Sequence, residues 1–225
     1  LENHHQILRK DLVVTRRAQK VNQAGTKSEL ARQVVKGGLE LRRDLEATLT
    51  NNQAVVIGND TTASVFGGLP AWLATNTDRG AGGADPTLSS TTFGYPNAAA
   101  TDGTDRALSE ASLLAIIKDC TVAGGKPTCI MTGPSVKQKL SQYLFGSSAR
   151  IATPYQDHGK AKKAASVVGA VDYYTSDFGT LEIIYNLFQR EDDVFVLDKS
   201  KWSLSHLDRY KVIDMAKVSD ATQKM

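Results

Sequence analysis

The sequence is poor in the residue types that mark several protein classes. Its 225 residues include two cysteines, three methionines and two tryptophans, and aromatic residues make up 7% of the chain. No apolar run approaches the roughly 18 residues that a membrane-spanning helix needs, so we expect no membrane segment. Cys120 and Cys129 fall on a predicted helix and a predicted strand, which favours two reduced, buried thiols over a disulfide framework.

A large excess of one charge is also absent. The net charge is +3, but residues 1–50 hold ten Lys and Arg against six Asp and Glu. Nucleic-acid-binding domains typically gather Lys and Arg on one face among aromatic residues, and Arg16, Arg17 and Lys20 have no aromatic neighbours. Two interpretations of this basic front stay open: a solvated strand and turn, or a contact with acidic patches of neighbouring subunits.

The front of the chain predicts one strand and one long helix. Residues 7–15 are rich in β-branched and charged side chains, which is typical of an edge strand or an arm. Residues 26–50 form the helix, and Thr26 with Glu29 has the spacing of a capping box. Its apolar residues lie on one narrow stripe, made of Leu30, Val34, Leu41, Leu45 and Leu49. We therefore expect this helix to lie on the outside of a domain.

Gly37 and Gly38 interrupt the interior of this helix, at a cost of about 1 kcal/mol each relative to alanine. Two explanations stay open. The glycines are tolerated sequence drift, or they allow another backbone to approach closely, such as an extended loop of a neighbouring subunit.

Residues 51–104 offer little for a core. They contain an apolar strand at 54–57, a GGLPAW turn, and a tract rich in Gly, Ala, Thr and Asn at 76–104. A loop of that length inside a compact domain is usually functional or ordered by contacts. We expect this one to cross a surface or to reach a neighbouring molecule.

The middle of the chain predicts a helix, a strand and a second helix in close succession. Ser109 has the position of an N-cap, Gly124 and Gly125 end the first helix, and Pro134 suits the first turn of the second. The strand between them is the apolar run at 129–131. A basic connection follows the second helix.

Two predicted strand pairs follow between residues 170 and 207, and with the preceding helices they make the predicted fold class α+β. Residues 170–175 pair with 180–185 around Asp177-Phe178-Gly179, and residues 194–197 pair with 202–207. We expect the hydrophobic cores to contain Trp72, Leu113, Ile116, Ile117, Ile130 and Trp202.

No set of residues predicts an enzyme, a metal site or a cofactor. Gly125-Lys126 fails as a phosphate-binding loop, because Cys120 stands where glycine is needed and Pro127 where Ser or Thr would bind magnesium. Asp177-Phe178-Gly179 is explained as a turn, since the other kinase signatures are missing. The four histidines, His4, His5, His158 and His206, lack the spacing of metal ligands. The acidic cluster at 191–193 precedes a strand and is more typical of a solvated turn than of a metal site.

Six segments resemble a known family, in the family's own order. They are QILRKDLVVTRR, LELRRDLEATL, GLPAWL, AGGKPTCIMTGPSVKQKLSQY, YYTSDFGTLEII and FVLDKSKWSL. Together they resemble the major capsid proteins of tailed bacteriophages with the Johnson, or Hong Kong-type, coat-protein fold. The resemblance implies a structural protein that self-assembles into hexamers and pentamers of an icosahedral or prolate shell around double-stranded DNA.

The resemblance also implies a domain layout. Residues 1–25 would be the return strand of an extended loop, and residues 26–104 a peripheral domain with the spine helix at 26–50. Residues 105–207 would be the axial domain, and residues 208–225 would return towards the peripheral domain. The family's N-terminal arm and final strand have no counterpart here, so we expect the chain to be an internal part of a longer gene product.

The expected partners are further copies of the chain, with scaffolding, portal and decoration proteins, non-specific contact with packaged DNA, and no membrane. The expected location is the virion capsid, with assembly in the host cytoplasm. We expect intersubunit electrostatics at Arg16, Arg17, Arg32, Lys36, Arg42 and Arg43. Gly37 and Gly38 would be the bending point of the spine helix during capsid maturation.

Three alternatives stay open. One is a small α/β enzyme acting on an anionic substrate, with residues 124–128 and 133–135 as binding loops and His158 as the nearby acid or base. Another is a bacterial nanocompartment shell protein, which shares the fold. The third is a nucleic-acid-binding module that uses the basic front, for which DNA affinity would depend steeply on salt.

Overall fold

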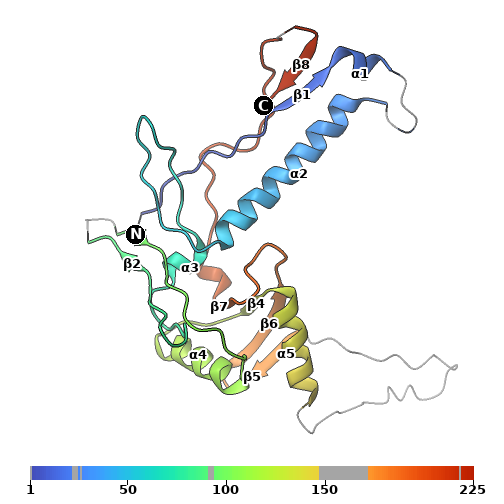
Figure 1. The fold of residues 1–225 in the computed structure, drawn as a ribbon. Coiled ribbons are helices and arrows are strands. Elements are labelled where there is room, and N and C mark those ends of the chain that lie inside the picture. The colour runs from blue at the N-terminus through green and yellow to red at the C-terminus, as the bar shows by residue number, and fades with distance from the viewer. Residues whose placement is uncertain (1, 22–24, 26, 91–93, 147–171, 218) are drawn as a thin grey trace, which may run out of the picture. The chain divides into compact units, whose positions relative to one another are not determined.

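The computed structural model describes residues 2–21, 25, 27–90, 94–146, 172–217 and 219–225 (Figure 1). The chain divides into two compact units. The first unit comprises Leu1–Thr75, Ala81–Gly103 and Leu204–Met225, and the second comprises Asn76–Gly80 and Thr104–Ser203. Within the described ranges, every helix is too short or too polar to cross a membrane.

The first unit contains one long helix and two small antiparallel sheets. Its elements are β1 (Leu12–Thr15), α1 (Arg16–Lys20), α2 (Glu29–Thr50), α3 (Leu69–Trp72), β2 (Thr87–Leu88), β3 (Pro96–Ala98) and β8 (Ala221–Lys224). Strand β1 pairs with β8, so that segments from the two ends of the chain form one sheet. Strand β2 pairs with β3, which places a short ladder inside the tract expected to be a plain loop.

Two strands expected in this unit are shorter than the sequence pattern indicates. The strand expected at 7–15 is confined to Leu12–Thr15, because only these residues have a partner in β8. The strand expected at 54–57 is reduced to a single bridge between Val56 and Val65. A strand needs a neighbour to accept its hydrogen bonds, and an apolar run by itself does not supply one.

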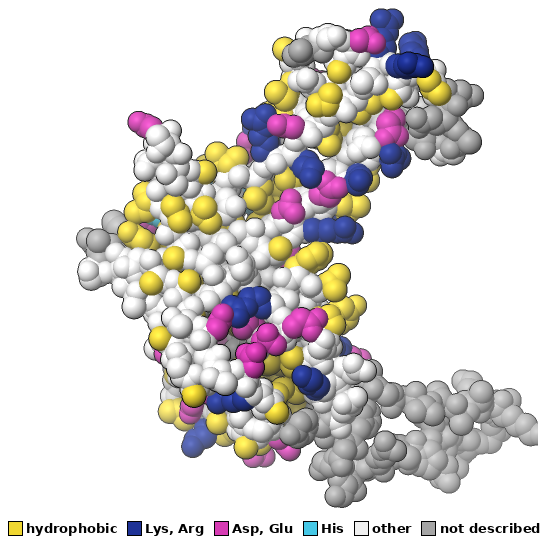
Figure 2. Space-filling view, viewed as in Figure 1, with side chains coloured by type: hydrophobic (Ala, Val, Ile, Leu, Met, Phe, Trp, Pro, Cys, Tyr) yellow, Lys and Arg dark blue, Asp and Glu magenta, His cyan; other side chains and the backbone are white. Residues whose placement is uncertain are grey.

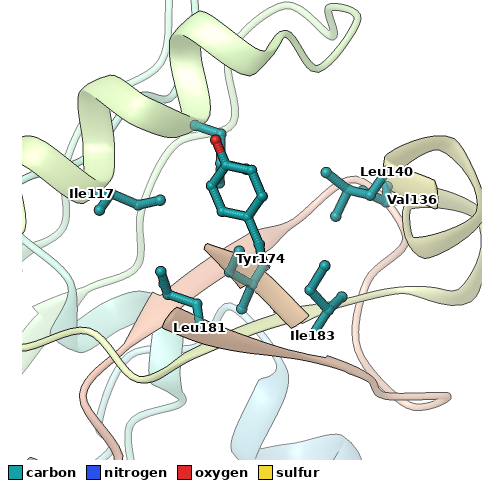
Figure 3. Close-up of a cluster of buried hydrophobic side chains, with 8 residues drawn as sticks. Ile117, Val136, Leu140, Tyr174, Leu181 and Ile183 are labelled. Carbon is teal, nitrogen blue, oxygen red and sulfur yellow. The ribbon is translucent and has the colours of Figure 1, made fainter. Parts of the chain in front are cut away.

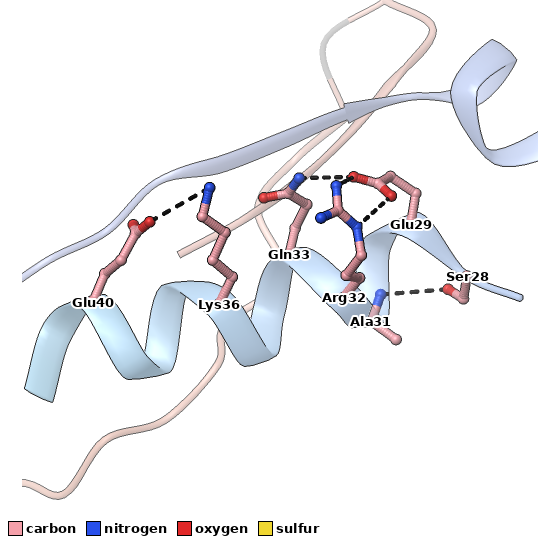
Figure 4. Close-up of polar contacts among 7 residues, drawn as sticks. All are labelled: Ser28, Glu29, Ala31, Arg32, Gln33, Lys36 and Glu40. Carbon is pink, nitrogen blue, oxygen red and sulfur yellow. Dashed lines mark hydrogen bonds and ion pairs between the residues drawn. The ribbon is translucent and has the colours of Figure 1, made fainter. Parts of the chain in front are cut away.

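Helix α2 begins one residue after Ser28, whose hydroxyl accepts a hydrogen bond of 3.3 Å from the amide of Ala31 (Figure 4). Ser28 therefore has the capping role that the sequence analysis gave to Thr26, which lies outside the described residues. The Glu29 carboxylate binds the side chains of Arg32 and Gln33, and the capping box predicted for it involves Thr26, outside the described residues. The predicted apolar stripe is half-buried along its length: Leu30, Val34, Leu41, Leu45 and Leu49.

The second unit is built on a four-stranded sheet in the order β5-β6-β4-β7. Its strands are β4 (Cys129–Thr132), β5 (Tyr173–Ser176), β6 (Gly179–Tyr185) and β7 (Val194–Leu197), and its helices are α4 (Glu110–Val122), α5 (Pro134–Gly146) and the short 3-10 helix Lys199–Lys201. Strand β4 runs parallel to β6 and antiparallel to β7. Strands β5 and β6 form the predicted hairpin.

The predicted pairing of residues 194–197 with 202–207 is wrong. Strand β7 pairs with β4 instead, and residues 202–207 lie outside the described strands with exposed side chains. The alternation of apolar and polar residues suits many partners equally, and β4 offers β7 a neighbour in which Cys129, Ile130 and Thr132 are buried.

The ends of α4 are set by local signals. The Ser109 hydroxyl accepts a hydrogen bond of 3.1 Å from the amide of Ser112. At the other end, Gly124 has φ of +84°, and the amides of Gly124 and Gly125 donate to the carbonyls of Thr121 and Cys120. This pairing is the Schellman motif, in which glycine adopts the left-handed conformation at low cost. The predicted start and end of this helix are confirmed.

One hydrophobic cluster joins α4 and α5 to the sheet (Figure 3). It contains Leu113, Ile117, Ile130, Val136, Leu140, Tyr174, Leu181 and Ile183. Of the other expected core residues, Ile116 is half-buried, and Trp72 is half-buried with its indole N–H donating to the carbonyl of Gly67. Trp202 corrects the expectation, because its side chain is 42% exposed. It follows the 3-10 helix and has no strand to hold it against the sheet.

Candidate intersubunit surface

The six basic residues expected to act between subunits fall into two places. Arg16 and Arg17 begin the short helix α1, and the other four lie on α2: Arg32, Lys36, Arg42 and Arg43. All six are exposed. Some of them form ion pairs with carboxylates of the same chain and thereby support the helix. The others have no such partner among the described residues and are available to another molecule.

Arg32 belongs to the first group. Its guanidinium donates two hydrogen bonds to the Glu29 carboxylate, at 2.8 and 2.5 Å, one turn away on the helix (Figure 4). Gln33 adds a third at 2.7 Å. The hydrogen bond from Arg32, with help from that of Gln33, lowers the pKa of Glu29 from 4.5 to about 2. Arg32 therefore stabilises the first turn of α2 through its ion pair with Glu29.

Lys36 also has a partner within the chain. Its ammonium group lies 3.7 Å from the Glu40 carboxylate, which also binds Lys10 at 2.8 Å. The hydrogen bond from Lys10 is the main cause that lowers the pKa of Glu40. Because Lys10 precedes β1 and Glu40 lies on α2, this network ties the front of the chain to the helix.

Arg42 and Arg43 have no ion-pair partner among the described residues. They follow two exposed apolar side chains on the same face of α2, Val35 and Leu39, which are 66% and 50% exposed. Residues four and seven positions apart on a helix share a face, so Val35, Leu39 and Arg42 form one line with Arg43 beside it. We call these four residues the outer stripe. Figure 2 shows Lys and Arg side chains along α2 with hydrophobic side chains between them.

Arg16 lies at the junction of β1 and α1 and is less available. Its backbone amide donates to the carbonyl of Asp220 at 2.8 Å, and its guanidinium lies 3.9 Å from the Asp220 carboxylate. Arg17 has no ion-pair partner among the residues described here. The structure thus brings four of the six residues onto one helix and leaves two on another element.

Gly37 and Gly38 serve different purposes. A Cβ at Gly37 would lie 3.3 Å from Cδ2 of Leu12, so this glycine makes room for a side chain of β1. A Cβ at Gly38 would meet no atom within 4 Å. The close approach considered for the pair therefore occurs at Gly37 and involves a side chain of the same molecule, while Gly38 faces open space.

The apolar members of the outer stripe were not singled out in the sequence analysis. Their signal was available, because Val35 and Leu39 precede Arg42 at helical spacing. The sequence analysis assigned the apolar face of this helix to the half-buried stripe that runs from Leu30 to Leu49, so Val35 and Leu39 were not considered as a second face. Burial values separate the two stripes where periodicity does not.

The loops of the enzymatic alternative have structural explanations. Gly124 and Gly125 end α4, and a Cβ at Gly133 would lie 3.0 Å from Cα of Glu191, so that loop is filled by the chain itself. His158 lies outside the described residues. Over the part of the chain that the structure describes, no three His, Cys, Asp or Glu side chains gather as a metal site.

The two cysteines are free thiols, Cys129 buried and Cys120 half-buried. Burial raises the pKa of both thiols, which disfavours the reactive thiolate form. The expectation of two reduced, buried thiols is confirmed for Cys129, while Cys120 is a free thiol that is only half-buried.

A comparison with protein families gives one result. The model of the SU10 major capsid protein family matches residues 1–225. No curated protein matches the chain. The family match spans both units, and it therefore includes the outer stripe on α2 as well as the sheet of the second unit.

Proposed function

Because this chain belongs to the SU10 major capsid protein family, it is a phage coat protein, and we propose that its copies assemble into hexamers and pentamers of a closed shell. The shell is icosahedral or prolate and encloses double-stranded DNA. The family match carries the coat-protein role, which is structural, and places the protein in the virion. The exposed outer stripe is the observation that supports a contact between copies.

The proposal assigns the two units to the layout of the Johnson fold. Helix α2 is the spine helix of a peripheral domain, and the sheet β5-β6-β4-β7 with α4 and α5 is the axial domain. The division of the chain near residues 103 and 203 supports this assignment, because the segment between them has its own core. Residues 1–25 serve as the arm of an extended loop, and residues 208–225 return to the peripheral domain.

Assembly in this proposal rests on many modest contacts repeated by symmetry. Arg42 and Arg43, which lack an ion-pair partner among the described residues, provide electrostatic selectivity, and Val35 and Leu39 provide apolar area. Scaffolding, portal and decoration proteins are further partners, DNA is contacted non-specifically, and assembly takes place in the host cytoplasm.

Gly37 and Gly38 are the proposed bending point of α2 during maturation. The helix is continuous from Glu29 to Thr50, and glycine is the weakest helix former after proline. The open space at Gly38 lets the helix bend there without a side-chain clash. A helix of the same curvature in immature and mature particles would contradict this role.

Sedimentation of the full-length gene product, with negative-stain images of every fast fraction, tests assembly directly. We expect closed shells, tubes or ring-shaped capsomers. The double variant Arg42→Glu/Arg43→Glu should shift the protein to slow fractions, and Arg42→Lys/Arg43→Lys, which keeps both charges, should still assemble. A monodisperse monomer of the unmodified protein at all salt concentrations, with or without its scaffolding protein, would overturn the proposal.

A further inference from the structure

The second unit carries an exposed surface whose charge is opposite to that of the outer stripe. It lies at residues 185–192, between the end of β6 and the start of β7, and we call it the acidic loop. Tyr185 and Leu187 are 60% and 69% exposed. Glu191 and Asp192 are also exposed and have no ion-pair partner among the described residues. The loop therefore combines two large apolar side chains with two unpaired negative charges.

Two buried side chains and their hydrogen bonds fix the conformation of the acidic loop. Asn186 and Gln189 are buried at 8% and 4% exposure. The Asn186 amide donates to the carbonyl of Thr132 at 2.8 Å, and the Gln189 side chain donates to the carbonyls of Met131 and Asp193 at 3.3 and 2.6 Å. The loop is thus fixed to the end of β4 by hydrogen bonds from Asn186 and Gln189.

Gly133 allows this loop to sit close to β4. A Cβ at that position would lie 3.0 Å from Cα of Glu191 and 3.4 Å from its carbonyl oxygen. Any larger residue would displace the backbone that carries the two acids. A loop ordered in this way loses little conformational entropy when it binds, because its geometry exists before contact.

We propose that the acidic loop of one copy binds the outer stripe of a second copy. Tyr185 and Leu187 pack against Val35 and Leu39, and Glu191 and Asp192 face Arg42 and Arg43. Two acids match two arginines, and all four large apolar side chains are exposed. Within the second unit, Arg190 lies 3.7 Å from Asp193, and the Lys137 ammonium lies over the Tyr185 ring at 5.5 Å from its centroid, so Leu187, Glu191 and Asp192 are the members of the loop most open to a second copy. The proposal rests on the function proposed above and identifies the partner of the same surface.

The contact joins two different surfaces of identical chains, so it is heterologous. Such contacts form closed rings when the rotation between successive copies closes. A hexamer and a pentamer both repeat one head-to-tail contact, which is the property that this pair of surfaces provides. Complementary charges also disfavour wrong registers, because these bring like charges together and weaken the association.

Charge exchange in the full-length gene product tests the pairing. Both Arg42→Glu/Arg43→Glu and Glu191→Arg/Asp192→Arg should lower the yield of fast-sedimenting particles by about tenfold or more, as expected for facing like charges. The fourfold variant, with both pairs reversed, should restore assembly. Combining Arg42→Glu/Arg43→Glu with Asp177→Lys is the matched control, since Asp177 is an exposed acid next to an exposed Phe178 on another turn. That combination should stay unassembled.

The outcomes separate this pairing from assembly itself. If the unmodified protein forms particles and Glu191→Arg/Asp192→Arg does so equally well, the pairing is wrong while the coat-protein assembly stands. Failure of the fourfold variant to assemble, with circular dichroism and melting temperature unchanged, would also overturn it.

A cross-linking experiment covers the case in which a charge variant misfolds. Particles carrying Leu39→Cys and Leu187→Cys should form ladders of disulfide-linked chains on oxidation. Leu39→Cys with Phe178→Cys is the control and should give no ladder. Equal ladders from both pairs, or none from the first, would contradict the proposed contact.

Discussion

The two units of this protein are stabilised in different ways. The second unit has a cluster of eight buried side chains that joins two helices to one face of a sheet. The described residues of the first unit bury smaller apolar side chains, namely those of Val14, Val55, Ala71, Ala100, Pro70, Pro86 and Pro96. Val55, Pro96 and Trp72 meet around Gly67, where a Cβ would lie within 3.0 Å of each of them. In the first unit, helix α2 adds to its half-buried apolar stripe a serine cap, ion pairs and Gly37, which makes room for the side chain of Leu12. The comparison teaches that the second unit is organised by its own core, whereas the first presents a long helix with much of its surface open to another molecule.

The largest expected effect lies in the second unit. Ile130 is fully buried, and Ile130→Ala should destabilise the protein by about 2–5 kcal/mol, because it removes buried methyl groups and leaves a cavity. Denaturant unfolding followed by circular dichroism measures the change. Val122 on α4 is 79% exposed, and Val122→Ala should change stability by less than about 0.5 kcal/mol. Equal effects at the two positions would mean that the cluster is not the source of stability.

The adjacent glycines of α2 test whether the first unit has any specific apolar contact. Gly38→Ala should stabilise the protein by about 1 kcal/mol, since alanine favours the helix and meets no neighbouring atom. Gly37→Ala should lose most of that gain, because its Cβ lies 3.3 Å from Leu12. Thermal unfolding compares them. In a Leu12→Ala background the two substitutions should become equivalent, and a difference that persists there would show that Leu12 is not the cause.

The smallest effect concerns the polar contacts of α2. The pKa of Glu29 is lowered from 4.5 to about 2, so its stabilising contribution is complete above pH of about 4.5 and is lost as the pH falls towards 2. Glu29→Gln should lower the melting temperature slightly at pH 7, and the difference from the unmodified protein should shrink with acidification. Arg32→Gln on top of Glu29→Gln should add little, because the partner is already absent. A difference that grows at low pH would contradict this assignment.

Helix ends were predicted best from the sequence. Ser109 and Gly124 act within one turn of their own helix, so their neighbours along the chain supply nearly all of the relevant physics. The turn between β5 and β6 is of the same kind, because Gly179 with φ of +139° takes a conformation that other residues rarely adopt. The buried positions Leu113, Ile117 and Ile130 also follow from local periodicity.

The pairing of strands and the exposure of some large side chains could not be predicted from local sequence. Trp202 has the size and polarity of a core residue, yet it is exposed because the chain beyond the 3-10 helix does not pair with β7. In the same manner, β1 finds its partner in β8, more than 200 residues away along the chain. Pairing of distant segments depends on which edges remain free after the rest has folded, and local composition carries no record of that.

The sequence allowed only part of the candidate surface to be predicted. The basic residues of α2 are visible as a pattern in the sequence, but their availability is not. Arg32 and Lys36 pair with Glu29 and Glu40, whereas Arg42 and Arg43 have no ion-pair partner in the described part of the chain. The acidic residues Glu191 and Asp192 were interpreted only as part of a solvated turn before a strand. Their place beside two exposed apolar side chains depends on a loop held by Asn186 and Gln189.

The sequence by itself determined the α+β class, the long polar helix, the caps and turns, and the resemblance to capsid proteins, because these follow from side chains that act on their immediate neighbours. Only the tertiary structure decided which apolar residues are buried, which strands pair, and which charges are left without a partner. Those properties depend on the distances between segments that are far apart in the chain. Such distances are set by packing, which no local pattern specifies.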